Sequence, residues 1–214
     1  MRRHQKRQNV PKNWPIARKG TKFVVKKNSN GVPVLVVLRD MMELAQNRKE
    51  VKSAIHKKHL SISGKLVANE KKSLELFDVL TVIPANKSYR LVLSDKGKFT
   101  MEEIADKEAN VKVSKIIGKK MISGNKTQIN LIDGRNYLSD VKCSVNDSVS
   151  IDLKKNEIKK VLPLKEKAEV LIIGGKHAGI KGKIIKLMPE DKMAEIEAGE
   201  AKFNALIKQL MIIN

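Results

Sequence analysis

The side chains in this sequence that are best suited to a chemical function are basic residues spaced along one short segment. Asn47 is placed to cap a helix, with Glu50 three residues on to complete a capping box. At about 100° per residue, five basic side chains of that helix would share an arc of roughly 100°. They are Arg48, Lys49, Lys52, His56 and His59. A row of cationic hydrogen-bond donors suits phosphate oxygens, so the pattern predicts contact with a nucleic acid backbone.

Two further elements are needed to position that basic row. Apolar residues at 38, 41, 42 and 45 recur at helical spacing and predict a first helix over 38–45. After the basic helix, Leu60 and Ile62 alternate with serines, Ser63-Gly64 supplies a tight turn, and Lys65 starts the returning strand. The segment 38–67 therefore predicts two short helices followed by a hairpin, with basic residues concentrated on one side.

The same segment resembles the RNA-binding module named after ribosomal protein S4. Three motifs carry the resemblance: Leu38-Arg39-Asp40, Asn47-Arg48-Lys49-Glu50 and the hairpin around Ser63-Gly64-Lys65. It implies RNA contacts from the whole basic side, which adds Arg39, Lys57, Lys58 and Lys65 to the residues above. The module also occurs in pseudouridine synthases and rRNA methyltransferases, so it predicts RNA binding without choosing a function. The alternative interpretation is an amphipathic helical hairpin whose charged face is only solvated.

The N-terminal segment is strongly basic. The chain carries 44 Lys and Arg against 23 Asp and Glu, a net charge of +21, and residues 1–39 contain eleven basic residues and no acid. Such a segment repels itself and is stabilised by neutralising phosphates. Its predicted RNA contacts are Arg2, Arg3, Lys6, Arg7, Lys12, Trp14, Arg18, Lys19 and Lys22. We expect residues 1 to about 20 to lack a core and to order on RNA, with Trp14 stacking on a base or inserting into a protein surface.

Several locations are excluded by the same sequence. The N-terminal charges are not followed by the apolar core of about 7–15 residues that a secretory signal needs. No apolar run reaches the roughly 18 residues that span a bilayer. Pro11, Pro15 and Gly20 interrupt the helix of a mitochondrial presequence. The single Cys143 allows no intramolecular disulfide and fits a reducing compartment. The sequence therefore predicts a cytoplasmic protein without membrane contact.

The rest of the chain predicts a succession of small β-rich modules. Seven aromatic residues in 214 are too few for one large aromatic core. Alternating apolar patterns predict strands over 76–83, 89–93, 111–117, 126–132, 135–138, 149–153 and 158–164, with 98–109 open between strand and helix. Short strands at this spacing predict a small barrel in the central part of the chain.

The C-terminal part contains a second specific motif. A predicted strand over 168–173 leads into Gly174-Gly175-Lys176-His177-Ala178-Gly179-Ile180-Lys181-Gly182-Lys183-Ile184. This run resembles the KOW motif of ribosomal proteins and NusG-type elongation factors, which implies an SH3-like barrel. Gly182 is expected to matter through backbone geometry. The candidate RNA contacts of the motif are Lys176, His177, Lys181 and Lys183.

Three motifs that could have carried catalysis or metal binding are incomplete. A P-loop-like glycine spacing has Ile180 where its lysine belongs. Gly134-Arg135 is similar to the catalytic stretch of pseudouridine synthases, yet Asn136 stands in place of the aspartate. His56 and His59 lack accompanying carboxylate or cysteine ligands. We therefore predict no catalytic residue, no metal site, no cofactor and no small-molecule substrate, and we do not expect an enzyme.

Four separated motifs together resemble one family. They are Asn9–Val25, Leu76–Val79, Asp133–Asn136 and Gly175–Gly182, and they have the same order in the archaeal and eukaryotic small-subunit ribosomal proteins called S4e. The resemblance implies an α+β, β-rich fold in four parts: an extended basic arm over 1–35, an S4-type helical and hairpin module over 36–94, a central β-barrel-like domain over 95–164 and a C-terminal SH3-like KOW barrel over 165–214. The segment 26–33 departs from the family, whose members carry a longer Pro- and His-containing link there.

The implied function is that of a structural constituent of the small ribosomal subunit. Its partners would be small-subunit rRNA and neighbouring ribosomal proteins, and it would support subunit assembly and translation on the cytoplasmic ribosome. Two alternatives use the same modules: an rRNA-modifying enzyme, and a ribosome-associated or transcription elongation factor. The enzyme would need a catalytic domain, and residues 95–214 offer neither a dinucleotide-type glycine loop nor a paired acid site. The elongation factor is supported by the KOW motif alone.

Overall fold

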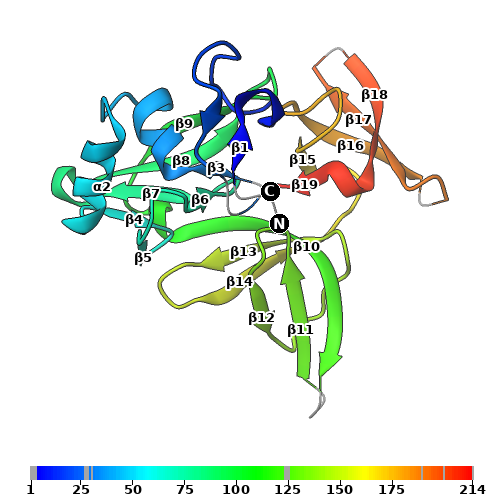
Figure 1. Ribbon diagram of the computed structural model, residues 1–214. Helices are drawn as coiled ribbons and strands as arrows, with labels where there is room; N and C mark the ends of the chain where they lie inside the picture. The colour runs from blue at the N-terminus through cyan, green and yellow to red at the C-terminus, as the bar shows by residue number, and fades with distance from the viewer. Residues whose placement is uncertain are drawn as a thin grey trace. The chain divides into compact units, whose positions relative to one another are not determined.

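The computed structural model describes residues 4–26, 29, 31–122, 126–188, 190–199 and 201–213. The chain forms two compact units (Figure 1). Unit 1 comprises Met1–Leu93 and Lys98–Asn110, and unit 2 comprises Ser94–Gly97 and Val111–Asn214. In the described ranges helices are few and short, and the strands form open antiparallel sheets. The β-rich fold expected from the sequence is therefore confirmed.

The first helical segment of unit 1 lies upstream of the predicted one. α1 (Val34–Val36) continues into a wide turn, η2 (Val37–Met41), in which the Met42 N–H donates to the Val37 carbonyl at 2.9 Å. The prediction of a helix over 38–45 is wrong at both ends, and the boundary expected after residue 35 falls inside α1. Residues 34–38 are all buried, so they lack the polar positions that make a helical period visible in a sequence.

α2 (Arg48–His56) begins as predicted. The Asn47 side chain accepts a hydrogen bond from the Glu50 N–H at 3.0 Å, and Glu50 Oε2 accepts one from the Gln46 N–H at 2.7 Å. The carboxylate thus reaches one residue further back than in the usual capping box. Val51 and Ile55 are buried, and this burial fixes the face that α2 turns to solvent.

Replacing Asn47 by alanine is expected to lower the free energy of unfolding by about 1 kcal/mol, because the first turn of α2 loses its side-chain acceptor. The Asn47→Asp variant keeps an accepting oxygen and should retain most of the stability. Urea denaturation of the parent chain and both variants measures the difference. If the alanine variant were as stable as the parent, the cap would contribute nothing.

The main sheet of unit 1 has the strand order β5-β4-β7-β8-β9. Its strands are β4 (Leu60–Ile62), β5 (Lys65–Leu66), β7 (Val79–Val82), β8 (Lys87–Leu93) and β9 (Phe99–Ile104). The predicted β4–β5 hairpin is confirmed: Ser63 and Gly64 have φ values of 48° and 79°, as a type I′ turn requires. The strand predicted over 76–83 begins only at Val79, because Phe77 adopts a positive φ of 62°. η3 (Ile83–Ala85) follows it.

The ambiguous stretch 98–109 resolves into β9 followed by η4 (Glu108–Asn110). β9 pairs with β8 along its whole length, from Ser88↔Ile104 to Leu93↔Phe99. Unit 1 therefore continues past the boundary expected after residue 94. The physical reason is that a hairpin partner belongs to the sheet it completes, whatever its position along the chain.

Two shorter strand pairs complete unit 1. β3 (Val32–Pro33) pairs with β6 (Ser73–Leu74), and β1 (Gln5–Lys6) pairs with β2 (Phe23–Val24). The N-terminal segment also contains η1 (Arg7–Asn9). Its Val10 and Trp14 are only 5% and 3% exposed. Burial of these two apolar side chains anchors the charged segment, and its ordering on RNA stays a prediction.

The first sheet of unit 2 has the strand order β12-β11-β10-β13-β14. Its strands are β10 (Val111–Ile122), β11 (Lys126–Leu131), β12 (Asn136–Leu138), β13 (Ser148–Asp152) and β14 (Glu157–Leu162). β10 pairs with β13 through its first half and with β11 through its second, and its register with β11 shifts between Ile116 and Gly118. The core contains Ile116, Ile129, Leu131, Tyr137, Val149 and Ile151. These strands were predicted, although β10 runs five residues past its predicted end at 117, and Gly134 lies in the expected turn at a φ of 78°.

The second sheet of unit 2 has the strand order β18-β17-β16-β15-β19. Its strands are β15 (Glu169–Ile172), β16 (Lys181–Met188), β17 (Met193–Ala198), β18 (Ala201–Leu206) and β19 (Leu210–Ile212), with η5 (Ile207–Gln209) before the last. The core contains Val170, Ile172, Ile184, Ala194, Ile196, Leu210 and Ile212. The sequence did not predict β17, β18 or β19.

Side-chain hydrogen bonds join the two sheets of unit 2 along one edge of β19. β15 pairs with the other edge. From β10, Lys115 Nζ donates to the Leu210 carbonyl at 2.8 Å and to the Ile207 carbonyl at 2.6 Å. From β13, Ser148 Oγ accepts from the Ile212 N–H at 2.9 Å. These contacts satisfy backbone groups that an edge strand would otherwise leave without a partner.

Candidate nucleic-acid interface

α2 holds its cations beside a buried stripe. Lys49, Lys52 and His56 are exposed, whereas Val51 and Ile55 on the neighbouring side are buried. The apolar side chains anchor the helix, so the backbone positions of the charged side chains are fixed before any ligand arrives. This is the arrangement that the sequence predicted for Arg48, Lys49, Lys52 and His56, whereas His59 lies beyond the end of α2.

Arg48 is held by a carboxylate from outside the helix. Its Nη2 donates to Glu70 Oε1, and the Glu70 side chain is 9% exposed while that of Arg48 is 55% exposed. Burial would raise the pKa of the Glu70 carboxyl, but the hydrogen bond from Arg48 and the charges of Arg48 and Lys52 outweigh it and lower that pKa. Glu70 therefore stays ionised and orients a guanidinium that remains open to water.

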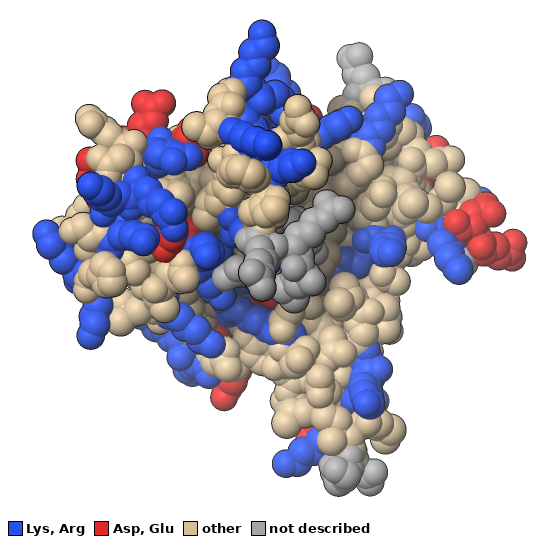
Figure 2. Space-filling model, in the orientation of Figure 1, with Lys and Arg blue, Asp and Glu red and all other residues tan. Residues whose placement is uncertain are grey.

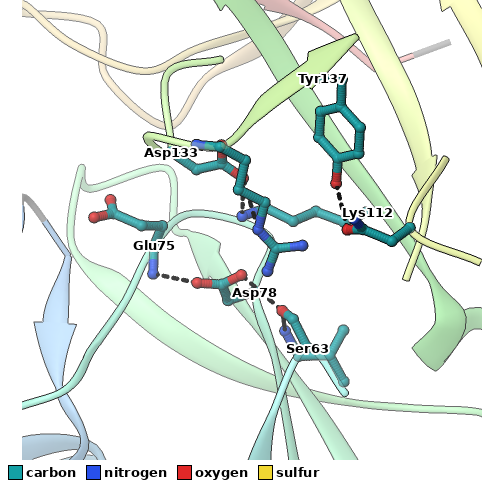
Figure 3. Close-up of polar contacts among 9 residues, drawn as sticks. Ser63, Glu75, Asp78, Lys112, Asp133 and Tyr137 are labelled. Carbon is teal, nitrogen blue, oxygen red and sulfur yellow. Dashed lines mark hydrogen bonds and ion pairs between the residues drawn. The ribbon is translucent and has the colours of Figure 1, made fainter. Parts of the chain in front are cut away.

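The β4–β5 hairpin is supported from beneath its turn. Ser63 Oγ donates to Asp78 Oδ1 at 2.7 Å, and Asp78 Oδ2 accepts from the Glu75 N–H at 2.8 Å (Figure 3). Ser63 and Asp78 are both buried, so the turn has a defined position. The hairpin thereby presents Lys65 to solvent on a rigid strand.

The exposed cations of this region gather on one side of unit 1. Figure 2 shows Lys and Arg side chains crowded over the part of unit 1 that contains α2, β4 and β5. We call the set the basic face, and its members are Arg48, Lys49, Lys52, His56, Lys57, Lys58 and Lys65. His59 is half-buried. Arg39, also half-buried, is paired with its neighbour Asp40 through contacts of 3.1 and 2.9 Å.

Two predicted contacts of the N-terminal segment instead build that segment. Arg7 donates to the Thr21 carbonyl at 2.8 Å, to the Ala17 carbonyl at 2.8 Å and to Thr21 Oγ1 at 2.9 Å. Arg18 Nη1 donates to the Val10 carbonyl at 3.1 Å. Both guanidinium groups therefore have structural partners, which sequence reasoning could not assign.

Four lysines of this segment stay exposed, namely Lys6, Lys12, Lys19 and Lys22. Trp14 is buried, so of its two expected roles the structure shows insertion into the protein, and the ring is not available to stack on a base. Arg2 and Arg3 lie outside the described residues. The predicted arm thus divides into side chains that fold it and side chains that face solvent.

The glycine-rich loop of unit 2 carries residues of two kinds. Lys176, Lys181 and Lys183 are exposed. His177 is half-buried, and its ring stacks on Phe203 of β18, with centroids 4.2 Å apart and an interplanar angle of 12°. Gly182 is approached closely by the next strand: a Cβ there would lie 2.6 Å from the Glu197 carbonyl oxygen.

Sequence reasoning missed two lysines of β10 that are only 1% exposed, Lys112 and Lys115. Lys112 Nζ donates to Asp133 Oδ2 at 2.7 Å (Figure 3). Arg135 Nε lies 3.6 Å from the same oxygen. Burial lowers the pKa of Lys115 to about 8. Residues 111–117 alternate Val with Lys and Ser before Ile116, so the sequence carries no signal that separates these lysines from surface cations.

Cys143 is a half-buried free thiol, and burial raises its pKa.

Within the described ranges, no three His, Cys, Asp or Glu side chains are grouped so that they could hold a metal ion. The described helices include none with the length and apolar character needed to cross a membrane.

The fold and its exposed cations define a β-rich protein with a surface suited to polyanions. The family model described as Ribosomal family S4e matches residues 85–158, and the RS4NT (NUC023) domain model matches residues 1–29. The chain is 34% identical to small ribosomal subunit protein eS4 of Methanospirillum hungatei, over 88% of this chain and 82% of that protein. It is 37% identical to eS4 of Archaeoglobus fulgidus, over 85% and 78% respectively.

A solved structure has the same fold. The crystal structure of the 30S ribosomal protein S4e from Thermoplasma acidophilum matches with a TM-score of 0.74 and 23% identity, over 86% of this chain and 94% of that one. The sequence matches cover most of this chain and most of each relative, and they agree with the match in fold. The chain belongs to the S4e family of ribosomal proteins.

Proposed function

We propose that this chain is a structural constituent of the small ribosomal subunit that binds rRNA and supports subunit assembly and translation. Membership of the S4e family supports the role. The observation that carries the RNA contact is the basic face, whose six Lys and Arg side chains and His56 lie on α2, the turn after it and the β4–β5 hairpin. Small-subunit rRNA and neighbouring ribosomal proteins are the partners, and the cytoplasmic ribosome is the place of action. The role is structural rather than catalytic.

We further infer that the basic face belongs to an S4-type module and that the second sheet of unit 2 is a KOW-type SH3-like barrel. The S4-type module is supported by the succession of α2 and a type I′ hairpin along the chain. Five antiparallel strands with a glycine-rich link between β15 and β16 support the second. Further proposed RNA contacts are Lys6, Lys12, Lys19, Lys22, Lys176, Lys181 and Lys183.

The proposed contact acts through phosphates and shape. Ammonium and guanidinium groups that neutralise phosphates release condensed counterions, which makes binding strongly dependent on salt. The deep, narrow major groove of an A-form RNA helix makes the base edges inaccessible to side chains. A rigid basic surface therefore recognises the RNA by the shape of its phosphate backbone. Glu70 contributes by holding the Arg48 guanidinium in one orientation, which reduces the entropy lost on binding.

Replacing Lys49, Lys52 and Lys65 together by glutamine is expected to flatten the salt dependence of rRNA affinity by about two to three units of log–log slope. Each lysine removed abolishes one phosphate contact and the counterion release that accompanies it. Arg48 is left in place because its loss would strand the buried Glu70 carboxylate. Filter binding of the full chain to small-subunit rRNA at several salt concentrations measures the slope. Co-sedimentation with small subunits through a salt wash should weaken in parallel.

A matched control removes three lysines from surroundings that already contain acids. Lys87 Nζ lies 3.1 Å from Glu103, Lys202 Nζ lies 3.9 Å from Glu197, and Lys192 follows Asp191 in the sequence. Their triple replacement by glutamine should leave the slope nearly unchanged. Equal effects of the two triple variants would show that net charge, and not the basic face, governs binding. An unchanged slope in the first variant would show that the face is merely solvated.

A further inference from the structure

Phe23 is the one exposed side chain among the Phe, Tyr and Trp residues that the structure describes. All seven aromatic residues lie within the described ranges: Trp14, Phe99 and Tyr137 are buried, Phe77, Tyr89 and Phe203 are half-buried, and Phe23 is 51% exposed. Aromatic rings contribute most of their stabilisation through buried area. A ring left in water is therefore a candidate for contact with a partner.

The ring stands on a rigid frame. Phe23 lies on β2 and faces Lys6 of β1 in the strand register. The Arg7 N–H donates to the Lys22 carbonyl at 2.9 Å, and the Arg7 guanidinium holds Thr21 on the approach to β2. The His4 ring meets Phe23 edge-on, with centroids 5.0 Å apart and an interplanar angle of 81°. The backbone that carries the ring is thus held in place before a ligand binds.

Cations surround this ring and acids are absent from its part of the chain. Lys22 Nζ lies 5.6 Å from the Phe23 centroid, within the range of a cation–π contact. Lys6 and Lys22 are both exposed. Residues 1–39 contain no Asp or Glu, so no carboxylate of this segment repels an approaching phosphate. The setting is an aromatic ring with one lysine over it and a second lysine on the paired strand.

An aromatic platform bordered by cations suits an unpaired nucleotide, whose base stacks on the ring while its phosphates meet the ammonium groups. A base inside a duplex is already stacked on both faces, so the ligand must come from a loop, a bulge or an end. We propose that Phe23 stacks on an unpaired base of the rRNA, with Lys6 and Lys22 on the adjoining phosphates. The proposal rests on the proposed function and adds a base-contacting site to the phosphate-contacting basic face.

Replacing Phe23 by leucine tests the platform, because leucine keeps apolar bulk and loses the π face. Affinity of the full chain for small-subunit rRNA should fall roughly 5- to 150-fold, the range for loss of one base–aromatic stack. The salt slope should stay unchanged, because no charge is removed. The Phe23→Tyr variant keeps the ring and should bind as the parent does. Equal melting temperatures of the three proteins show that folding is intact.

A spectroscopic readout separates stacking from general proximity. In the Phe23→Trp variant, rRNA should quench the new indole emission, because a stacked base is in direct contact with the ring. The buried Trp14 gives a background common to all variants. The Leu206→Trp variant, at a residue of β18 that is 40% exposed, serves as a control that should change little.

The outcomes distinguish this proposal from the one on which it rests. If the parent binds rRNA and Phe23→Leu binds equally well, the stacking site is wrong and the ribosomal role stands. If the parent shows no affinity for rRNA, the proposed function fails and the stacking site fails with it. If Phe23→Leu loses only the binding of a neighbouring ribosomal protein, the ring is a protein contact and the proposal is overturned.

Discussion

Gly182→Val is expected to lower the free energy of unfolding of unit 2 by at least about 3 kcal/mol. A Cβ at Gly182 would lie 2.6 Å from the Glu197 carbonyl oxygen and 2.6 Å from Ile196 Cγ2. The oxygen belongs to the backbone of β17, which pairs with β16, so it cannot withdraw without disturbing the sheet. The cause is the close approach of a neighbouring strand, since Gly182 is not among the glycines with positive φ. Thermal unfolding and hydrogen exchange of β15–β17 amides measure the loss.

Two sets of control variants test whether the loss of stability comes from this steric clash. A Cβ at Gly118 in β10 would find its nearest neighbour, Asn130 Nδ2, at an ordinary 3.6 Å, so Gly118→Val should change stability little. Lys176→Ala and Lys181→Ala should leave the melting temperature nearly unchanged and weaken rRNA binding, because both side chains are exposed. A loss at Gly118 as large as that at Gly182 would contradict the close-approach explanation. Unfolding by either lysine variant would make those residues structural.

Elements governed by local interactions were predictable from the sequence. The Asn47 cap and the Ser63-Gly64 turn depend on hydrogen bonds and φ preferences within a few residues, and both have the predicted form. The strands between residues 111 and 162 have apolar residues at alternating positions in the sequence, which reveals their period. Residues 34–38 are buried on all sides and show no period. β19 is a short apolar run, and such runs do not distinguish a strand from a helix.

The candidate site was predictable as far as exposure follows from helical period. Lys49 and Lys52 face solvent because buried side chains on the neighbouring stripe fix the orientation of α2. Residue type alone does not show whether a charge is free: Arg7 binds Thr21 and Ala17, and its guanidinium is committed within the protein. Trp14 is buried and Phe23 is exposed, although both lie in the same basic segment. This difference depends on tertiary contacts, which no local sequence pattern encodes.

Lys115→Met is expected to lower the free energy of unfolding of unit 2 by about 2–3 kcal/mol at pH 7. Methionine fills a similar volume, but the Ile207 and Leu210 carbonyls lose the donor that covers the edge of β19. The cost is partly offset, because the variant no longer buries an ammonium group. Ser148→Ala removes the other side-chain bond to that edge, from the Ile212 N–H, and should cost about 1–2 kcal/mol. Urea denaturation measures both, and a fully stable Lys115→Met would show that the edge needs no such cover.

The difference between parent and Lys115→Met should also grow with pH. Burial lowers the pKa of Lys115 from its ordinary 10.5 to about 8. Between pH 8 and pH 10.5 the unfolded chain binds more protons than the folded one, so the contribution of Lys115 to the free energy of unfolding rises with pH. Well below pH 8 the side chain is protonated in both states, and its contribution does not change with pH. The parent should gain about 1.5 kcal/mol relative to the variant between pH 8 and pH 9.5. The neutral amine still has two N–H groups for the two carbonyls, so deprotonation costs no hydrogen bond. A difference that stayed flat or shrank over this range would mean that Lys115 is not buried as a titrating amine.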